Sequence, residues 1–245
     1  MNFSEINIKK AFLHIIIPTF NASGTIKMLV NQLEKTLYDY EFKLILIDDA
    51  STDHTTSIIA SLSKEYDNIR YHFSHRNQGQ QASLQIGLSM LTTPCDYVIT
   101  MDDDMQNPVE VVKKLIDEIQ LGYDLVYAIP VSNHRSTKSG PTLMRRCGSL
   151  FRDILFHSFM NKPQGIKVSA FRIMTYDLAV KIASSRKKYF YLSAEAFQYE
   201  IKVSNIYYPF ASRYSGRSSY NFRKLLIVYL RLLLTYKLKL FKWVK

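Results

Sequence analysis

Short apolar runs alternate with helix-like segments along the first 130 residues. Five runs have the length of strands, at residues 12–18, 42–47, 69–73, 97–99 and 123–129, and the first is a near-continuous apolar run as in a strand covered on both faces. Between them, apolar residues recur at helical spacing, which predicts helices over 26–37, from 51–53 to about 62, over 80–91 and over 109–121. The second helix can be capped by Ser51, Thr52 or Asp53. The alternation predicts an α/β fold with a Rossmann-like, doubly wound and mostly parallel sheet.

Polar residues gather immediately after these strands, where open α/β sheets bind ligands. The sharpest case is the acidic triplet Asp102, Asp103 and Asp104, which follows the strand at 97–99 and precedes Pro108. Three neighbouring carboxylates repel one another and lose water, which a cation would offset. In an extended segment the side chains of Asp102 and Asp104 can point the same way, while Asp103 points opposite. Such a pair suits Mg²⁺ or Mn²⁺ that is also bound by a substrate diphosphate. The alternative is an acidic turn at the positive end of the next helix.

The rest of the composition narrows the class of protein. A chain of 245 residues can bury the core of one large α/β domain. Cys95 and Cys147 are too few for a disulfide framework, so we expect free thiols in a reducing compartment. There is no signal-peptide pattern and no apolar run of the ~18–20 residues that span a bilayer. Dinucleotide and P-loop glycine motifs are absent too. We therefore expect a cytoplasmic protein.

The net charge of +11 belongs to the C-terminal part of the chain. Ten of the 32 Lys and Arg follow Glu200, after which there is no acid, so the first 200 residues carry 22 basic and 21 acidic residues. Over residues 222–245, most basic side chains fall on one narrow side of a helix and apolar ones cover the rest. This predicts a domain at 1–221 and a basic amphipathic helix at 222–245 lying in a membrane interface. A helix packed on the domain or on a partner is the alternative.

Four motifs follow successive strands in order: PTFN at 18–21, DDASTD at 48–53, RNQG at 76–79 and DDD at 102–104. Together they resemble family 2 of the inverting glycosyltransferases, which have the nucleotide-binding GT-A fold. Residues 96–110 further resemble the MDADLQ block of polyprenyl-phosphate glycosyltransferases, the branch that contains dolichyl-phosphate mannose synthase. FR at 171–172 and RYSGRSSY at 213–220 resemble two later elements of that branch. The resemblance covers roughly residues 12–225.

The resemblance implies a role for each matching position. The nucleotide sugar would be bound by Pro18, Phe20, Asn21, Asp49, Asn77, Gly79, Asp102 and Asp103, with Asp49 accepting from the base. Mg²⁺ or Mn²⁺ would be surrounded by Asp102, Asp104 and Gln106. The acceptor phosphate would be contacted by Arg145, Arg146, Ser149 and Arg217. Asp104 and Arg213 would act in catalysis, since the guanidinium fork matches phosphate oxygens.

The chain also departs from the lipid-linked branch. Ala22 replaces a glutamate, Asp103 replaces a small residue, Ser169 and Ala170 replace a Gly-Asp pair, and Ser219 replaces a lysine. An arginine expected after the fifth strand has no clear match, and Arg135 is the nearest. These departures leave the fold and the use of a nucleotide sugar as the firmer expectations.

The two glycosyltransferase hypotheses differ in the acceptor of the sugar. A polyprenyl phosphate at the inner face of the membrane is already anionic and needs positioning rather than a base. A glycan hydroxyl needs a carboxylate to take its proton. Glu195 is the candidate in the helix-like stretch 190–199, and the alternative for it is the wet face of that helix. A nucleic-acid-binding module and a non-catalytic nucleotide-binding scaffold are further readings; no base-reading motif supports the first.

Two segments outside the strand-end motifs carry further expectations. Relatives in the lipid-linked branch often continue into transmembrane helices, so we expect peripheral membrane contact through 222–245, assisted by a membrane-protein partner or a second copy. The polar loop at 130–141 is either a mobile lid or acceptor loop, or an idle surface loop.

Overall fold

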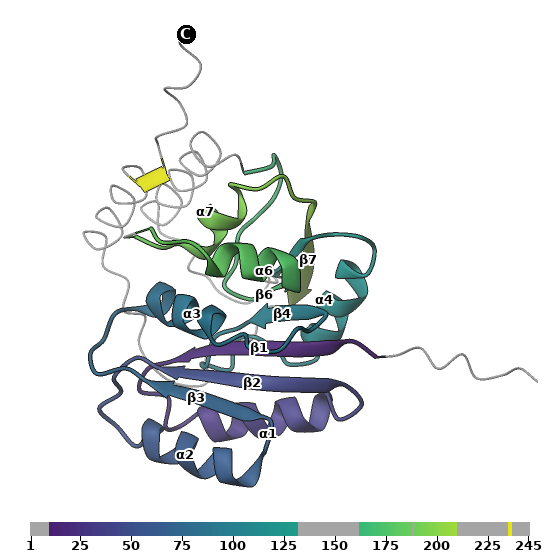
Figure 1. The fold of residues 1–245 in the computed structure, drawn as a ribbon. Coiled ribbons are helices and arrows are strands. Elements are labelled where there is room, and N and C mark those ends of the chain that lie inside the picture. Colours follow the sequence, from purple (N-terminus) through teal and green to yellow (C-terminus); the bar gives the residue numbers. More distant parts are fainter. Residues whose placement is uncertain (1–9, 132–161, 188, 210–234, 237–245) are drawn as a thin grey trace, which may run out of the picture.

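The computed structural model describes residues 10–131, 162–187, 189–209 and 235–236, and within them seven strands form one sheet (Figure 1). The strands are β1 (Phe12–Thr19), β2 (Glu41–Asp48), β3 (Ile69–Phe73), β4 (Tyr97–Thr100), β5 (Leu125–Val131), β6 (Arg172–Thr175) and β7 (Val203–Pro209). The helices are α1 (Ile26–Thr36), α2 (Thr55–Glu65), α3 (Gln80–Ser89), α4 (Val111–Ile119), α6 (Tyr176–Ala183) and α7 (Leu192–Ala196). The five strands and four helices predicted for the first 130 residues are confirmed.

The order of the strands places a switch point beside β1. The sheet runs β3-β2-β1-β4-β6-β5-β7, and β1 pairs in parallel with both β2 and β4. The chain therefore builds outward from β1 to β3 and then returns to the other side of β1. Ligands of open α/β sheets bind beyond the carboxyl ends of the strands at such a point. Here that position lies between the end of β1 and the acidic triplet after β4.

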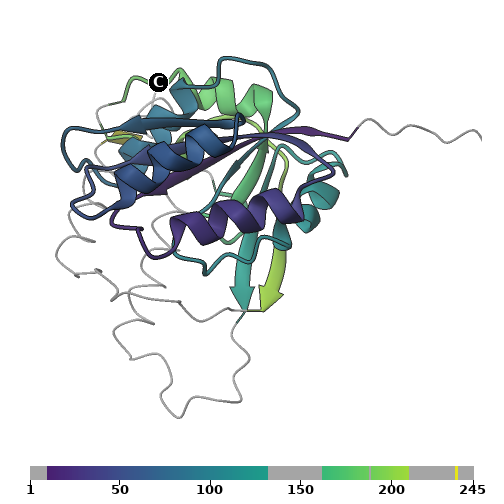
Figure 2. The ribbon, with the colours of Figure 1, turned by 90° about the horizontal axis from the view of Figure 1, so that it is seen from below.

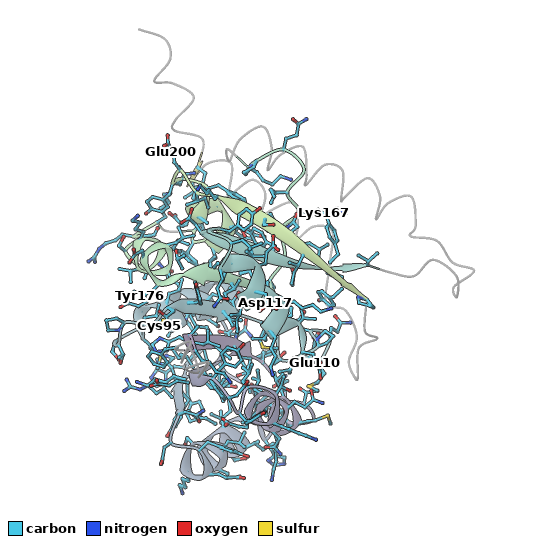
Figure 3. The ribbon with its side chains drawn as sticks, turned by 90° about the vertical axis from the view of Figure 1, so that its right-hand side faces the viewer. Cys95, Glu110, Asp117, Lys167, Tyr176 and Glu200 are labelled. Carbon is cyan, nitrogen blue, oxygen red and sulfur yellow. The ribbon has the colours of Figure 1, made fainter. Side chains whose placement is uncertain are left out.

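One described strand runs against the others. β6 pairs antiparallel with β4 and β5, whereas β5 and β7 pair in parallel and appear in Figure 2 as adjacent arrows pointing the same way. The sheet is thus mixed, and β6, α6 and β7 had no counterpart among the predicted elements. Figure 3 shows the reversal: Tyr176, after the end of β6, lies on the same side as Cys95, before β4, and opposite Glu110, beyond β4. The first residue of β6 therefore lies at the carboxyl edge of the sheet.

Alternating side chains of the strands supply a core on each face of the sheet. Leu13, Ile15 and Ile17 of β1 pack with α1, α2 and α4, while Ile16 packs with α3, α6 and α7. Figure 1 shows α1 and α2 on one face and α3 on the other. At Gly87 of α3, an added Cβ would lie 2.4 Å from Ile16 Cγ2. Glycine is what allows α3 to approach β1 this closely.

The expectation for the start of α2 is tested here, whereas the expectations for the loop at 130–141 and for the segment 222–245 are not. The N-cap residue of α2 is His54, whose own side chain makes no cap, but Asp53 Oδ1 accepts the amide of Thr55, the first residue of the helix, at 3.0 Å, so of the three predicted residues Asp53 contributes to this end. No helix in the described ranges is long and apolar enough to cross a membrane. Most of the loop at 130–141 and of the segment 222–245 lies outside the described residues. The division at 221/222 therefore stays a prediction.

Candidate active site

The first two motifs tie the loops after β1 and β2 to each other. The Asn21 amide donates to Ser51 Oγ at 2.8 Å, and Asn21 Oδ1 accepts the Thr52 amide at 2.8 Å. Asp53 accepts the amides of Ser23 at 3.1 Å and Thr55 at 3.0 Å. Burial raises the pKa of Asp53, but the hydrogen bonds from Thr55 and Ser23 outweigh it and lower the pKa to about 2. These side chains therefore build the frame of the site.

Asp49 connects the β2 loop to the start of α3. Its buried carboxylate accepts the amides of Gln78 at 2.8 Å and Gly79 at 2.7 Å. Asn77 Nδ2 donates to the Asp49 carbonyl oxygen at 3.2 Å. Gly79 has φ of +88°, a conformation that L side chains rarely adopt, and it caps α3. The structure brings these three predicted residues together. Each Asp49 oxygen already receives one backbone donor and keeps a second lone pair for a ligand.

The three acids after β4 have different partners. Asp102 Oδ1 accepts from Gln80 Nε2 on α3, Asp103 Oδ2 accepts the Phe20 amide at 3.1 Å, and Asp104 Oδ1 accepts the Gln106 amide at 3.1 Å. Asp103, the departure from the family motif, therefore links the β4 loop to the β1 loop across the switch point. Phe20 itself is 48% exposed at this edge, whereas Pro18 is buried within β1.

The electrostatics of the acidic loop suit a cation. Burial and then Asp104 raise the pKa of Asp102, and burial raises the pKa of Asp103 to about 7 against the hydrogen bond from Phe20. Within the described residues, no group of three or more His, Cys, Asp or Glu could by itself hold a metal ion. Asp102 and Asp104 fit the other way of holding Mg²⁺, in which one or two carboxylates share the ion with substrate phosphates.

Arg172, which the sequence analysis quoted without giving it a role, lies beside this loop. It is buried at the start of β6, and its guanidinium carbon is 5.5 Å from the centre of the Tyr127 ring. Its Nε donates to Thr100 Oγ1 at 3.1 Å and its Nη1 donates to Ser193 Oγ at 2.7 Å. Burial and Asp104 raise the pKa of Asp102, and Arg172 lowers it. Its place in the FR motif at residues 171–172 was the signal that could have identified it.

Glu195 is not on a wet helix face. It is 3% exposed on α7, and its Oε1 accepts from Tyr236 Oη at 2.8 Å and lies 3.0 Å from Lys187 Nζ. The interpretation as a solvated carboxylate is therefore wrong. Its suggested role as a general base stays a prediction, and one carboxylate oxygen already has two donors.

Backbone strain gathers at the same edge of the sheet. In the described part of the chain, three residues other than glycine have positive φ: Asn21 at 52°, Ala50 at 60° and Met105 at 63°. They lie in the loops after β1, β2 and β4. Such conformations cluster where a fold holds a ligand or catalytic group, so the strain marks the edge already marked by the switch point.

The remaining predicted contacts lie outside the described residues. They are Arg145, Arg146, Ser149, Arg213 and Arg217. Their roles toward phosphates stay predictions.

Two relatives of known name are similar to this chain in sequence. A Pseudomonas fluorescens undecaprenyl-phosphate 4-deoxy-4-formamido-L-arabinose transferase is 32% identical over 118 residues, 47% of this chain and 34% of that protein. The Photorhabdus laumondii protein of the same name is 26% identical over 92% of this chain and 67% of its own length. The chain thus spans about a third to two thirds of these relatives.

Solved structures share the fold. Glucosyl-3-phosphoglycerate synthase from Mycobacterium tuberculosis, in complex with Mn²⁺, UDP-glucose and phosphoglyceric acid, superposes with a TM-score of 0.63 at 15% identity. The match covers 92% of this chain and 79% of that one. Residues 14–179, more than half of the chain, match the family described as Glycosyl transferase family 2. The chain therefore belongs to glycosyl transferase family 2 and has its GT-A fold.

Proposed function

We propose that the protein transfers a sugar, with inversion, from a nucleotide-sugar donor to a polyprenyl phosphate. The observation that carries this proposal is the placement of Asp102 and Asp104 at the switch point, with Arg172 beside them. The names of the relatives support undecaprenyl phosphate as the class of acceptor. A neighbour bound to Mn²⁺ and UDP-glucose supports the class of donor and a divalent metal.

The donor would lie across the loops after β1, β2 and β4. Asp102 and Asp104, with Gln106 beside them, would hold Mg²⁺ or Mn²⁺, which when bound would neutralise the charge of the departing nucleoside diphosphate. Asp49 would keep the β2 loop and the start of α3 in register around the nucleotide. Phe20, exposed at the same edge, offers an aromatic face to the donor.

The contacts of Glu195 favour a phosphate acceptor over a glycan hydroxyl. A hydroxyl acceptor needs a base within hydrogen-bond reach of its proton. Glu195 is buried and holds Tyr236 and Lys187. A lipid phosphate is anionic at neutral pH and needs only positioning, which Arg145, Arg146, Ser149, Arg213 and Arg217 would supply. The reaction would take place at the inner face of the membrane, with 222–245 as the peripheral contact.

Labelled nucleotide sugars incubated with undecaprenyl phosphate in detergent test the proposal. We expect an acid-labile lipid-linked sugar whose formation stops with EDTA and returns with excess Mg²⁺ or Mn²⁺. Asp104→Ala should abolish its formation, and Asp117→Ala, at an exposed position on α4, is the matched control. Transfer to a glycan without any lipid-linked product would refute the acceptor. Full activity in EDTA would refute the requirement for a divalent metal.

A further inference from the structure

Tyr236 belongs to the C-terminal segment but is buried against α7, with 5% of its surface exposed. Its hydroxyl donates to Glu195 Oε1 at 2.8 Å and accepts the Tyr191 amide at 3.3 Å. Lys187 Nζ lies 3.0 Å from the same Glu195 oxygen and 4.1 Å from the centre of the Tyr236 ring. Both the hydroxyl and the ring are therefore engaged by α7 and the residues just before it.

The opposite side of α7 reaches the acidic loop through Arg172. Ser193 Oγ, two residues before Glu195, accepts from Arg172 Nη1 at 2.7 Å. The Nε of the same guanidinium donates to Thr100 Oγ1 at 3.1 Å. Thr100 is the last residue of β4, two positions before Asp102. Because all three side chains are at most 3% exposed, these hydrogen bonds are shielded from water.

A second route passes through α3. The Leu192 amide donates to Gln81 Oε1 at 3.0 Å. The neighbouring Gln80 donates its side-chain amide to Asp102 Oδ1. α7 is thus hydrogen-bonded toward the position of Asp102 from two directions, and Tyr236 is fixed to the same helix.

We propose that Tyr236 is a positioning residue for sugar transfer: by holding Glu195 it fixes α7, and α7 keeps Arg172 and α3 in place around Asp102. The proposal rests on the proposed function. Glu195 is then a structural anchor for the C-terminal segment. α7 has only five residues, so it has little hydrogen bonding of its own to define its position. Its contacts at both ends must do so.

Tyr236→Phe is the most direct test, because it removes the hydroxyl and keeps the ring over Lys187. We expect kcat for transfer to fall about tenfold, since small misplacements of reacting groups lower rates by up to about 100-fold. KM for the nucleotide sugar should change by less than about twofold. Tyr38→Phe is the control, because the Tyr38 side chain is 81% exposed in the loop between α1 and β2. A change in melting temperature with kcat unchanged would overturn the proposal.

A pair of substitutions separates an anchor from a general base. Glu195→Gln keeps an oxygen that can accept from Tyr236, so an anchor should retain at least about a third of kcat. Glu195→Ala removes that oxygen and should match the loss of Tyr236→Phe. If Glu195 were the base, the glutamine variant would be as inactive as the alanine variant, and the limb of the pH–rate profile due to its ionisation would disappear.

Hydrogen exchange keeps the test independent of substrate identity. In Tyr236→Phe, peptides covering residues 98–107 should exchange faster than in the wild type, and peptides covering 41–48 should not change. Unchanged exchange at 98–107 would overturn the coupling even if transfer activity were found. Absence of transfer by the wild type, with faster exchange in the variant, would refute the proposed function and leave the coupling supported.

Discussion

His14 makes the protein sensitive to acid, and the structure sets the size of the effect. The side chain is 2% exposed in β1, and neither ring nitrogen has a hydrogen-bond partner among the described residues. Burial, then Lys43 and then Arg70, lower its pKa from 6.5 to about 4. The pKa is depressed in the folded state, so the stabilisation is complete above about pH 6.5 and is lost as the pH falls toward 4. A difference of about 2.5 in pKa corresponds to roughly 3 kcal/mol, of which about 2 kcal/mol is lost by pH 5.

His14→Leu should abolish this loss, and urea unfolding between pH 8 and pH 4.5 measures it. Asp103 acts in the opposite direction: its pKa is raised to about 7, so its protonation stabilises the fold as the pH falls. The wild-type curve alone therefore mixes two effects, and the difference between variant and wild type isolates His14. That difference should grow by about 2 kcal/mol from pH 8 to pH 5. Parallel curves would refute the reasoning, and His72→Leu, at an exposed position, is the control.

Three further predictions test the fold and the site. Gly87→Ala should destabilise the protein by about 1–3 kcal/mol in urea unfolding, because the new Cβ would lie 2.4 Å from Ile16 Cγ2. Since Ile16 is itself buried, the loss in the double variant Gly87→Ala/Ile16→Ala should be smaller than the sum of the two single losses. Asp104→Ala should abolish transfer while Asp103→Ala keeps most of the initial rate, since Asp103 holds the β1 loop; equal losses would contradict this division. Arg172→Met leaves two buried hydroxyls without their donor and should cost roughly 1–3 kcal/mol together with most of the transfer rate; a variant with a full rate would show that this guanidinium is not needed beside the acids.

The first half of the fold could be predicted because most of its strands, namely β1, β2, β4 and β5, are largely buried on both faces. Continuous Ile, Leu and Val runs, with helical spacing between them, give parallel strands a clear signature. β3 was predicted with its observed bounds, 69–73, although only Ile69 within it is buried. The later elements lack this signature. β6 has four residues and contains Arg172, so neither length nor apolarity distinguishes it from a loop.

The sequence predicted where the site lies in the fold but not which hydrogen bonds its residues make. Strand ends and motif order placed Asp49, Gly79 and the acidic triplet at one edge, which the structure confirms. The hydrogen-bond partner of each side chain could not be predicted. A bond such as the one from the Gln78 amide to Asp49 Oδ1 depends on how two loops approach each other. Asp103 is the clearest case: its partner, the Phe20 amide, is 83 residues away in sequence.

These contacts change how the family motifs act in this chain. Asn21, Asp49 and Asp53 have their side-chain oxygens engaged by backbone amides of neighbouring loops. Their effect on a nucleotide sugar would therefore come first through the shape of those loops. Substituting them should lower affinity and stability together, because each removed oxygen leaves a backbone donor unsatisfied. Asp104 instead accepts the amide of Gln106 within its own loop. If Asp104 binds the metal together with the donor diphosphate, Asp104→Ala should lose transfer in proportion to metal binding, and full transfer by this variant would refute that role.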